Sequence, residues 1–325
     1  CNMQGSDADA ILVDDIEFAY VYTLEDAEQF NAQPFEKTFV QGRGYMASYQ
    51  SATTVSMTGT LNHENTFTYS GLTYSGSNDM KKRWANFFLL GNPFPYDVKW
   101  NEFDYSGIVP GFAVVNSTSG AYQYDVDVES TIKSGDGFMI LTNAASPSLS
   151  VTATRGANNR NTDYINVVAN GAAGSDNLII SLAGKENGGF LKLDNFNDDI
   201  AKVFVTNYDD MYGIAYYDED VEEVDFCFNA SDLGYYTISM IPNGDFTSLK
   251  LYDRVENIET DMIQNKEYKF FALSNDDANE NRFVLRYAKK NVEAEGNFAY
   301  QSGNDLVVNA EGLIQIVDVM GRIVY

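Results

Sequence analysis

Short apolar runs alternate with turn residues along most of the chain. Each run holds about four to eight apolar or β-branched positions, and Gly, Asn, Asp and Ser bound it, as in "SGSND" and "KSGDG". Runs of this length that recur at intervals of about 8 to 12 residues are typical of antiparallel sandwiches and barrels. Clear examples are "AILVDDIEFAYVY" (10–22), "GFAVVN" (111–116), "GFMILTN" (137–143), "AKVFVTN" (201–207) and "RFVLRYA" (282–288).

The pattern predicts an all-β fold made of tandem antiparallel β-sandwich domains. The 22 Tyr and 21 Phe residues fall mostly within the apolar runs, where aromatic side chains favour strands. Only "LEDAEQFNAQ" (24–33) has a helical pattern, and it spans about three turns.

Two polar stretches divide the strand-rich blocks from one another. "TRGANNRNTD" (154–163) is rich in glycine and asparagine, and "YAKKNVEAEGN" (287–297) is charged. Because such segments are typical of domain boundaries, we expect one β-sandwich at 1–155, a second at 156–290 and a short block at 291–325. The last block is too short to close a sandwich by itself.

The charge balance is strongly acidic, which narrows the set of partners. Asp and Glu total 47 against 21 Lys and Arg, a net charge of −26. Such a surface repels phosphate backbones, and no basic patch in the sequence offsets it, so we expect no nucleic-acid binding. No run of about 18 apolar residues is present, so we also expect no membrane span. The first residues do not read as a signal peptide.

Histidine and cysteine are too scarce for several kinds of active site. The single histidine, His63, lies in "GTLNHENTF" beside an expected turn, whereas zinc sites draw on several Cys or His ligands. We therefore expect no enzyme activity and no resident cofactor. Cys227 is expected to point away from the face of its strand that carries Phe226 and Phe228. Three interpretations of Cys1 stay open: a lipid-modified residue, a partner of Cys227, or simply the residue at which the sequence begins.

Two of the six prolines lie one residue apart in "LLGNPFPYDVKW" (89–100). Gly91 tolerates a positive φ, and Asn92 is held in extended geometry by the proline that follows it. Pro93 and Pro95 remove two backbone donors, so sheet pairing stops there. The stretch predicts a rigid corner at the end of a buried strand, and it contains no nucleophile or ligand set.

This corner also resembles a segment common in secreted, β-rich surface proteins of the Bacteroidota. Three further stretches are similar to sequences of that family, in the same order along the chain. They are "FVQGRGYMASY" (39–49) with "VSMTGTLN" (55–62), "IKSGDGFMILTN" (132–143), and the segment at 248–287 that ends in "RFVLRY".

The final residues, "LVVNAEGLIQIVDVMGRIVY" (306–325), resemble the opening of the C-terminal sorting domain of type IX (Por) secretion cargo. In that family the domain begins with a strand and turn, here Val317 to Val324, and the later strands and basic tail are not among these residues. The resemblance implies the C-terminal region of such a cargo protein and an Ig-like fold for 291–325. It also implies export by the type IX machinery, to a secreted location or the outer cell surface.

The densest acidic stretch, at 195–226, is a candidate cation site. Calcium takes about six to eight oxygen ligands, which the surface loops of β-sandwiches can supply. No D-x-[DN]-x-[DN]-G spacing is present, and the alternative is a solvated acidic face that opposes edge-to-edge aggregation. The candidate calcium ligands are Asp198, Asp199, Asp209 and Asp210.

Several aromatic residues alternate or adjoin along the strands, so some must face away from the core. An exposed aromatic platform can stack on the apolar face of a sugar ring. The alternative is that these side chains pack between the sheets. The candidate ligand-binding aromatics are Trp84, Trp100, Tyr216 and Tyr217, with Tyr122 and Tyr124 as further members of the set.

Three classes of function remain. The sequence favours a non-catalytic protein with an adhesive or structural role, whose partners are the type IX machinery and glycans or surface proteins of a host or neighbouring cell. The alternative is a carbohydrate-binding module that serves a larger surface enzyme. The third is a hydrolase built on an acid pair, which requires two carboxylates roughly 5–9.5 Å apart in one cleft.

Overall fold

The structure is a computed structural model that describes the chain in separate stretches. Backbone and side chains are described for 40–45, 62, 64–76, 86–153, 163–182, 184, 189–207, 210–218, 221–273 and 281–289. The backbone alone is described for 3–4, 10–14, 20–25, 29–33, 38–39, 46–48, 56–58, 60–61, 299–302 and 305–308. The chain forms two compact units, Cys1–Ala288 and Lys289–Tyr325.

The described secondary structure consists of strands and one 3-10 turn, η2 (Trp100–Glu102), so the predicted all-β class is confirmed. In the second unit the described strands are β29 (Ala299–Ser302) and β30 (Asp305–Val308), which form an antiparallel hairpin. The Ig-like fold of 291–325 stays a prediction, because Val317 to Val324 lie outside the described residues.

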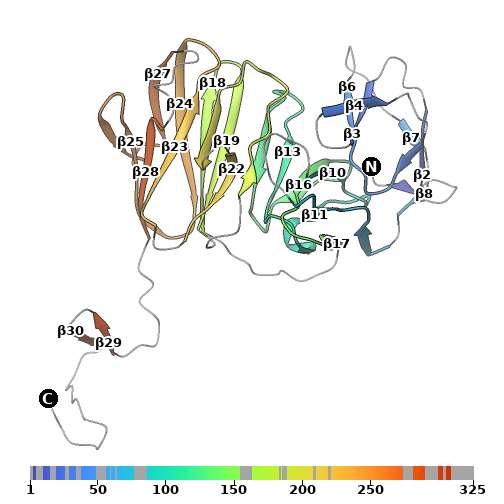
Figure 1. Cartoon of the computed structure of the whole chain (residues 1–325), viewed down its shortest axis with the longest axis horizontal. Helices are drawn as coiled ribbons and strands as arrows, with labels where there is room; N and C mark the ends of the chain where they lie inside the picture. Colours follow the sequence, from blue (N-terminus) through green and yellow to red (C-terminus); the bar gives the residue numbers. More distant parts are fainter. Residues whose placement is uncertain are drawn as a thin grey trace, which may run out of the picture. The chain divides into compact units, whose positions relative to one another are not determined.

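The first strands of the chain are short and form small antiparallel sheets (Figure 1). One joins β2 (Ala10–Asp14) to β5 (Thr38–Val40) and β7 (Ser56–Thr58), and a second joins β3 (Tyr20–Glu25) to β4 (Gln29–Gln33) and β6 (Met46–Ser48). A third pairs β1 (Met3–Gln4) with β8 (Thr60–Leu61).

The helix predicted at 24–33 is wrong, because these residues turn back on themselves as a β-hairpin. Leu24 lies opposite Phe30, and Glu25 lies opposite Gln29. A helix of about three turns is marginal in water unless it buries an apolar face. Pairing of β3 with β4 instead provides hydrogen-bond partners for the backbone of this segment.

Two sheets of the middle region, residues 64–153, enclose a common core. The first sheet contains β9 (Thr66–Tyr69), β17 (Ser148–Thr152) and β12 (Phe103–Ser106). The second contains β10 (Phe87–Gly91), β16 (Gly137–Leu141), β13 (Phe112–Val115) and β14 (Tyr122–Asp125). A short pair, β11 (Val98–Lys99) with β15 (Thr131–Ile132), borders them. The buried cluster between the sheets includes Phe103, Val151, Phe112 and Phe138.

Residues 164–289 form one large sheet, in which most strands are long and antiparallel (Figure 1). Its strands are β18 (Tyr164–Gly171), β19 (Gly174–Ser181), β20 (Phe190–Leu191), β21 (Lys202–Asn207), β22 (Asp210–Tyr216), β23 (Glu223–Asn229), β24 (Gly234–Asn243), β25 (Phe246–Asp253), β26 (Ile258–Asp261), β27 (Glu267–Ala272) and β28 (Phe283–Lys289). Their order is β26-β25-β28-β23-β21-β22-β19-β18-β24-β27, with β20 beside β22. One pair, β19 with β22, is parallel.

The large sheet curves around its own core. Leu251 on β25 and Phe270 on β27 belong to strands near opposite ends of the strand order, yet both lie in the same buried cluster. Buried and more exposed positions alternate along "SLKLYD" and "EYKFFA", so that Leu251 and Phe270 face the core; the exceptions to an apolar interior and a polar exterior are the buried Asp253 and the exposed Phe271.

A second buried cluster joins the middle region to the large sheet. Phe87 and Tyr124 of the middle region contact Phe190, with ring centroids 5.6 and 5.8 Å apart. Burial of each such side chain stabilises the fold by roughly 1.5–3 kcal/mol. The predicted boundary at 155 lies within 154–162, outside the described residues, and the regions on either side of it pack as neighbours in one unit.

The proline corner is held by one buried amide side chain. Asn92 Nδ2 donates to the carbonyls of Tyr96 (2.9 Å) and Ile132 (3.1 Å), and its Oδ1 accepts the Phe94 N–H (2.9 Å). These bonds replace the strand partners that Pro93 and Pro95 cannot provide.

The "QGRGY" stretch lies against the strand that leads into this corner. The Gly44 N–H donates to the Leu89 carbonyl (3.1 Å), and the Gly91 N–H donates to the Gly42 carbonyl (2.9 Å). A Cβ atom on Gly44 would lie 2.6 Å from the Leu90 carbonyl oxygen and 2.7 Å from Leu89 Cγ. Glycine is therefore required there because the two backbones approach too closely for a side chain.

We expect Gly44→Ala to lower the free energy of unfolding by about 1–3 kcal/mol, because the added methyl group forces β10 and its neighbour apart. The control is Gly234→Ala on β24, where a Cβ atom meets nothing within 4 Å. We expect a change within about 0.5 kcal/mol for the control. Denaturant titration of both variants measures the difference, and equal values for the two would contradict the close approach.

Candidate functional site

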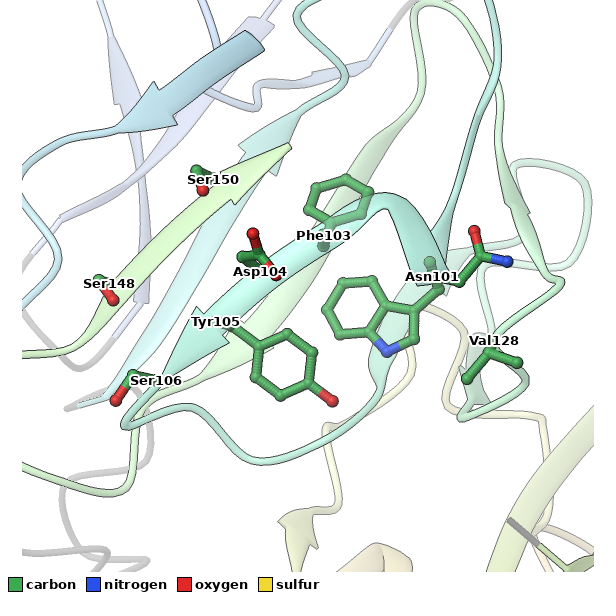
Figure 2. Close-up of a pocket in the computed structure, with 9 residues that line it drawn as sticks. Asn101, Phe103, Asp104, Tyr105, Ser106, Val128, Ser148 and Ser150 are labelled. Carbon is green, nitrogen blue, oxygen red and sulfur yellow. The ribbon is translucent and has the colours of Figure 1, made fainter. Parts of the chain in front are cut away.

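A cavity of about 280 Å³ opens beside β12 and is the best candidate for a binding site (Figure 2). Residues from η2, β12, β17 and the loop before β15 line it. They are Trp100, Asn101, Phe103, Asp104, Tyr105, Ser106, Val128, Ser148 and Ser150.

The polar wall of the cavity follows from the pairing of β12 with β17. Asp104 lies opposite Ser150, and Ser106 lies opposite Ser148, so one carboxylate and three hydroxyls share one face of the two strands. Figure 2 shows Asp104 and Ser106 on one strand, with Ser148 and Ser150 on its neighbour. The alternate positions, Phe103 with Val151 and Tyr105 with Leu149, carry the apolar side chains.

Aromatic rings that line the cavity stack on one another, on the opposite face of β12 from Asp104 and Ser106. The ring centroids of Trp100 and Tyr105 are 5.3 Å apart with an interplanar angle of 26°, and those of Trp100 and Phe103 are 5.1 Å apart. The Trp100 side chain is 3% exposed, so it forms a fixed interior surface, whereas Tyr105 is half-buried. Aromatic packing of this kind holds these rings rigid.

A fixed carboxylate lies next to the amide that borders the cavity. Glu129 accepts hydrogen bonds from Lys99 Nζ (2.6 Å) and from Asn101 Nδ2 (2.8 Å). The hydrogen bond from Lys99 lowers the pKa of the Glu129 carboxyl, and the same bond raises the pKa of Lys99. Asn101 is therefore held in one orientation at this edge.

This set of groups suits a neutral, hydroxyl-rich ligand. Hydroxyls, an amide and a carboxylate can exchange hydrogen bonds with a polyol, and aromatic rings can contact its CH groups. Asp104 is the one carboxylate among the residues described around the cavity. The neighbouring carboxylate, Glu129, is paired with Lys99 and Asn101.

A further cavity, of about 370 Å³, lies between the "QGRGY" stretch, β9 and β10. Its walls include Phe67, Leu72, Phe88 and Leu89, with Arg43 and Gln41 at one side. The Gln41 side chain donates to the Pro93 carbonyl (3.3 Å). The Arg43 guanidinium lies 5.8 Å from the centroid of the Tyr45 ring. Most of the other side chains that line this cavity are apolar, so it offers fewer hydrogen-bonding groups than the first.

The aromatic residues proposed from the sequence do not form an exposed platform in the described part of the chain. Trp100 is buried, as are Tyr122 and Tyr124. Tyr216 packs against the cluster that joins the two regions and donates its hydroxyl to the Pro110 carbonyl. Tyr217 packs against the core of the large sheet. The alternation of strand faces sends these two neighbours into different cores, and Trp84 lies outside the described residues.

The aspartates proposed as calcium ligands lie in two places. Asp198 and Asp199 precede β21, whereas Asp210 begins β22 after the hairpin at the far end of β21. The ends of a six-residue strand are roughly 17–20 Å apart, too far for one ion to bridge. No group of three or more His, Cys, Asp or Glu residues that could hold a metal is found in the described stretches. Asp209 lies outside them.

The remaining candidates are a histidine and a thiol. His63 lies outside the described residues. Cys227 is buried on β23, and Cys1 lies outside the described residues. Phe226 and Phe228 lie in the core of the large sheet, and the Cys227 thiol instead contacts Thr206 Oγ1 at 3.7 Å. Its predicted orientation is confirmed.

Two features of the large sheet escaped the sequence analysis. An exposed aromatic pair, Tyr235 (67% exposed) and Phe271 (42% exposed), lies across β24 and β27 with ring centroids 5.1 Å apart and an interplanar angle of 71°. Two buried ion pairs join Lys192 to Asp176 and Arg282 to Asp253. The sequence signal for the pair of Lys192 and Asp176 was the lone lysine in the apolar run "GFLKL" (189–193).

No protein-family model, curated protein or solved structure matches the chain. Among the residues that the structure describes, no helix has the length and apolar character needed to cross a bilayer.

The packing of Tyr217 predicts how it titrates. Burial, followed by the negative charge of Asp225, raises the pKa of Tyr217 to about 12. Because the unfolded value is about 10, the neutral hydroxyl stabilises the fold fully below pH 10, and this contribution is lost as the pH rises towards 12.

The difference in tyrosinate absorbance between the chain and Tyr217→Phe measures this pKa, with circular dichroism to confirm that both stay folded. A pKa near 10, as for a solvent-exposed tyrosine, would contradict the packed position. It would also make Tyr217 a candidate for binding a ligand again.

Proposed function

We propose that this chain is a non-catalytic, secreted or cell-surface protein with an adhesive or structural role, exported by a type IX route. The ordered motifs between 39 and 325 support this proposal, as does the resemblance of 306–325 to the opening of a sorting domain. The observation that carries the structural role is the buried interface between the middle region and the large sheet.

Hydrogen bonds from buried amides tie the two regions together in this interface. Asn177 on β19 accepts the Tyr124 N–H and donates to the Tyr124 carbonyl, both at 2.9 Å, as a neighbouring strand would. Asn195 accepts the Tyr122 N–H at 2.9 Å. Sliding one region over the other breaks these bonds and exposes the apolar cluster around them. An interface of this kind suits a protein that carries load as one body.

The outer face of the large sheet supports a role in solution or at a surface. Lys250, Glu259, Arg286 and Glu223 form a row of ion pairs across β25, β26, β28 and β23, with N–O distances of 2.7–2.9 Å. Exposed pairs of this kind contribute little stability. Together with the net charge of −26, they keep the sheet hydrated and disfavour pairing between copies.

Location in the cell tests the proposal. Antibodies against this chain should label intact cells of the source bacterium, and external protease should remove the signal. A strain that lacks the type IX outer-membrane translocon should lose the label and retain the protein inside. A periplasmic protein serves as the control for cell integrity, and a signal that resists protease on intact cells would contradict a surface role.

The cavity beside β12 favours a second candidate function, which is carbohydrate binding in the service of a larger surface enzyme. The polar face that Asp104, Ser106, Ser148 and Ser150 share is the supporting observation, and the half-buried Tyr105 ring lines the same cavity. Asp104 adds an acceptor that can hold two neighbouring sugar hydroxyls.

A glycan array probed with this chain should give hits, and calorimetry on those hits should show that Asp104→Ala weakens binding by about tenfold or more. Loss of a hydrogen bond to a charged group costs about 1.5–3 kcal/mol, and 1.4 kcal/mol is tenfold in Kd. Asp198→Ala, at an exposed aspartate outside the cavity, should bind as the unaltered chain does. An array without hits would rule out this second function.

A further inference from the structure

Lys192 and Asp176 form an ion pair in the interior of the chain. Asp176 lies on β19, and Lys192 follows β20, sixteen positions further along the chain. Their side chains are 1% and 0% exposed, and Lys192 Nζ lies 2.7 Å from Asp176 Oδ2. Sequence neighbours of Lys192 belong to the apolar cluster between the two regions, and its Nζ lies 4.7 Å from the centroid of the Tyr124 ring.

The contacts of the two side chains are unequal. Asp176 Oδ2 also accepts the Val203 N–H at 2.8 Å, and Lys192 Nζ also donates to the Asn177 carbonyl at 2.8 Å. Asp176 Oδ1 is buried and has no hydrogen-bond partner among the described residues. A buried carboxylate oxygen without a donor is costly, and so is an ion pair held away from water.

Burial also favours an uncharged amine. Removal from water lowers the pKa of Lys192, and the negative charge of Asp176 opposes this shift. A desolvated lysine amine is a nucleophile, and the fixed approach of amine and carboxyl replaces an encounter in solution.

We propose that Lys192 and Asp176 condense within the folded chain to an isopeptide bond between Nζ and Cγ. The site is a self-modification site, and it is independent of the surface role and of any ligand in the cavity.

The atoms of this step balance without an external reactant. A proton passes from Nζ to Oδ2, the carboxylate oxygen that it contacts, which leaves a neutral amine and a neutral acid. A half-turn of the carboxyl group about the Cβ–Cγ bond then exchanges the two oxygens, so that the hydroxyl takes the Oδ1 position and the carbonyl oxygen takes the Oδ2 position. The Nζ lone pair forms the bond to Cγ, and an electron pair of the carbonyl moves to Oδ2. The Val203 N–H, which already donates to Oδ2, stabilises the charge that develops there.

Collapse of this intermediate breaks the bond between Cγ and Oδ1. Oδ1 leaves as water with two of the three protons that the ammonium carried, and the third stays on the amide nitrogen. The Asn177 carbonyl is placed to accept that remaining N–H.

The product resolves the imbalance of the ion pair. Both buried charges disappear, and the oxygen without a partner departs as water. The amide carbonyl keeps the hydrogen bond from Val203, so every remaining polar atom of the link has a partner. The link ties β19 to the segment after β20, beside the Asn177 bonds that hold the two regions together.

The intact mass of the purified chain tests this proposal. Mass spectrometry under denaturing conditions should give a mass lower than that of the sequence by one water molecule. Trypsin should then release a branched peptide that joins residues 161–185 to 186–202, because acylated Lys192 is no longer a cleavage site. Loss of water at any other position gives no branched peptide and overturns the assignment.

The intact masses of three variants distinguish an isopeptide bond from an ion pair between the same two side chains. Lys192→Arg, which keeps the positive charge, and Asp176→Ala should both show the full mass expected from their sequences. Arg282→Met breaks the other buried ion pair and should still show the loss of one water. A full, unmodified mass for the unaltered chain, with no branched peptide, overturns the proposal whether or not the variants fold.

Discussion

The architecture depends on how the middle region and the large sheet meet without a shared strand ladder. Asn177 solves this problem, because its amide presents both an acceptor and a donor to the backbone of Tyr124. The surrounding apolar side chains exclude water, which makes each of these hydrogen bonds harder to break. Side-chain hydrogen bonds therefore fix the position of the middle region against the large sheet. Within a sheet, hydrogen bonds between backbones do this.

The two buried ion pairs show that the geometry of the cationic side chain decides whether both oxygens of a buried carboxylate have a hydrogen-bond donor. Arg282 donates from Nε and Nη2 to the two oxygens of Asp253, and Tyr268 adds a third donor at 3.0 Å. A guanidinium fork matches a carboxylate in this way, so both oxygens are satisfied. The Lys192 ammonium is a single point of contact and leaves one oxygen of Asp176 without a partner. The same type of pair is thus inert in one core and poised for condensation in the other.

Most of the aromatic side chains and the groups suited to binding a ligand lie in different parts of the structure. Most of the aromatic residues that the sequence suggested as ligand contacts lie in or against the three buried clusters, where their large apolar area stabilises the packing of the sheets. The groups suited to a ligand instead gather on the rim formed by β12 and β17. Strand register alone places Asp104 and the serines on one face there.

The sequence by itself determined the all-β class, the corner at Pro93 and Pro95, and the orientation of Cys227, because turn chemistry and a period of two are local properties. It could not separate strand from helix at 24–33, since a short segment takes its structure from the partner it pairs with. Only the tertiary structure decided that Tyr216 and Tyr217 pack into different cores and that Asp198 and Asp210 lie apart. The same holds for Lys192 and Asp176, which meet in a buried interior. These relations depend on which strands become neighbours, and no local pattern along the chain encodes that choice.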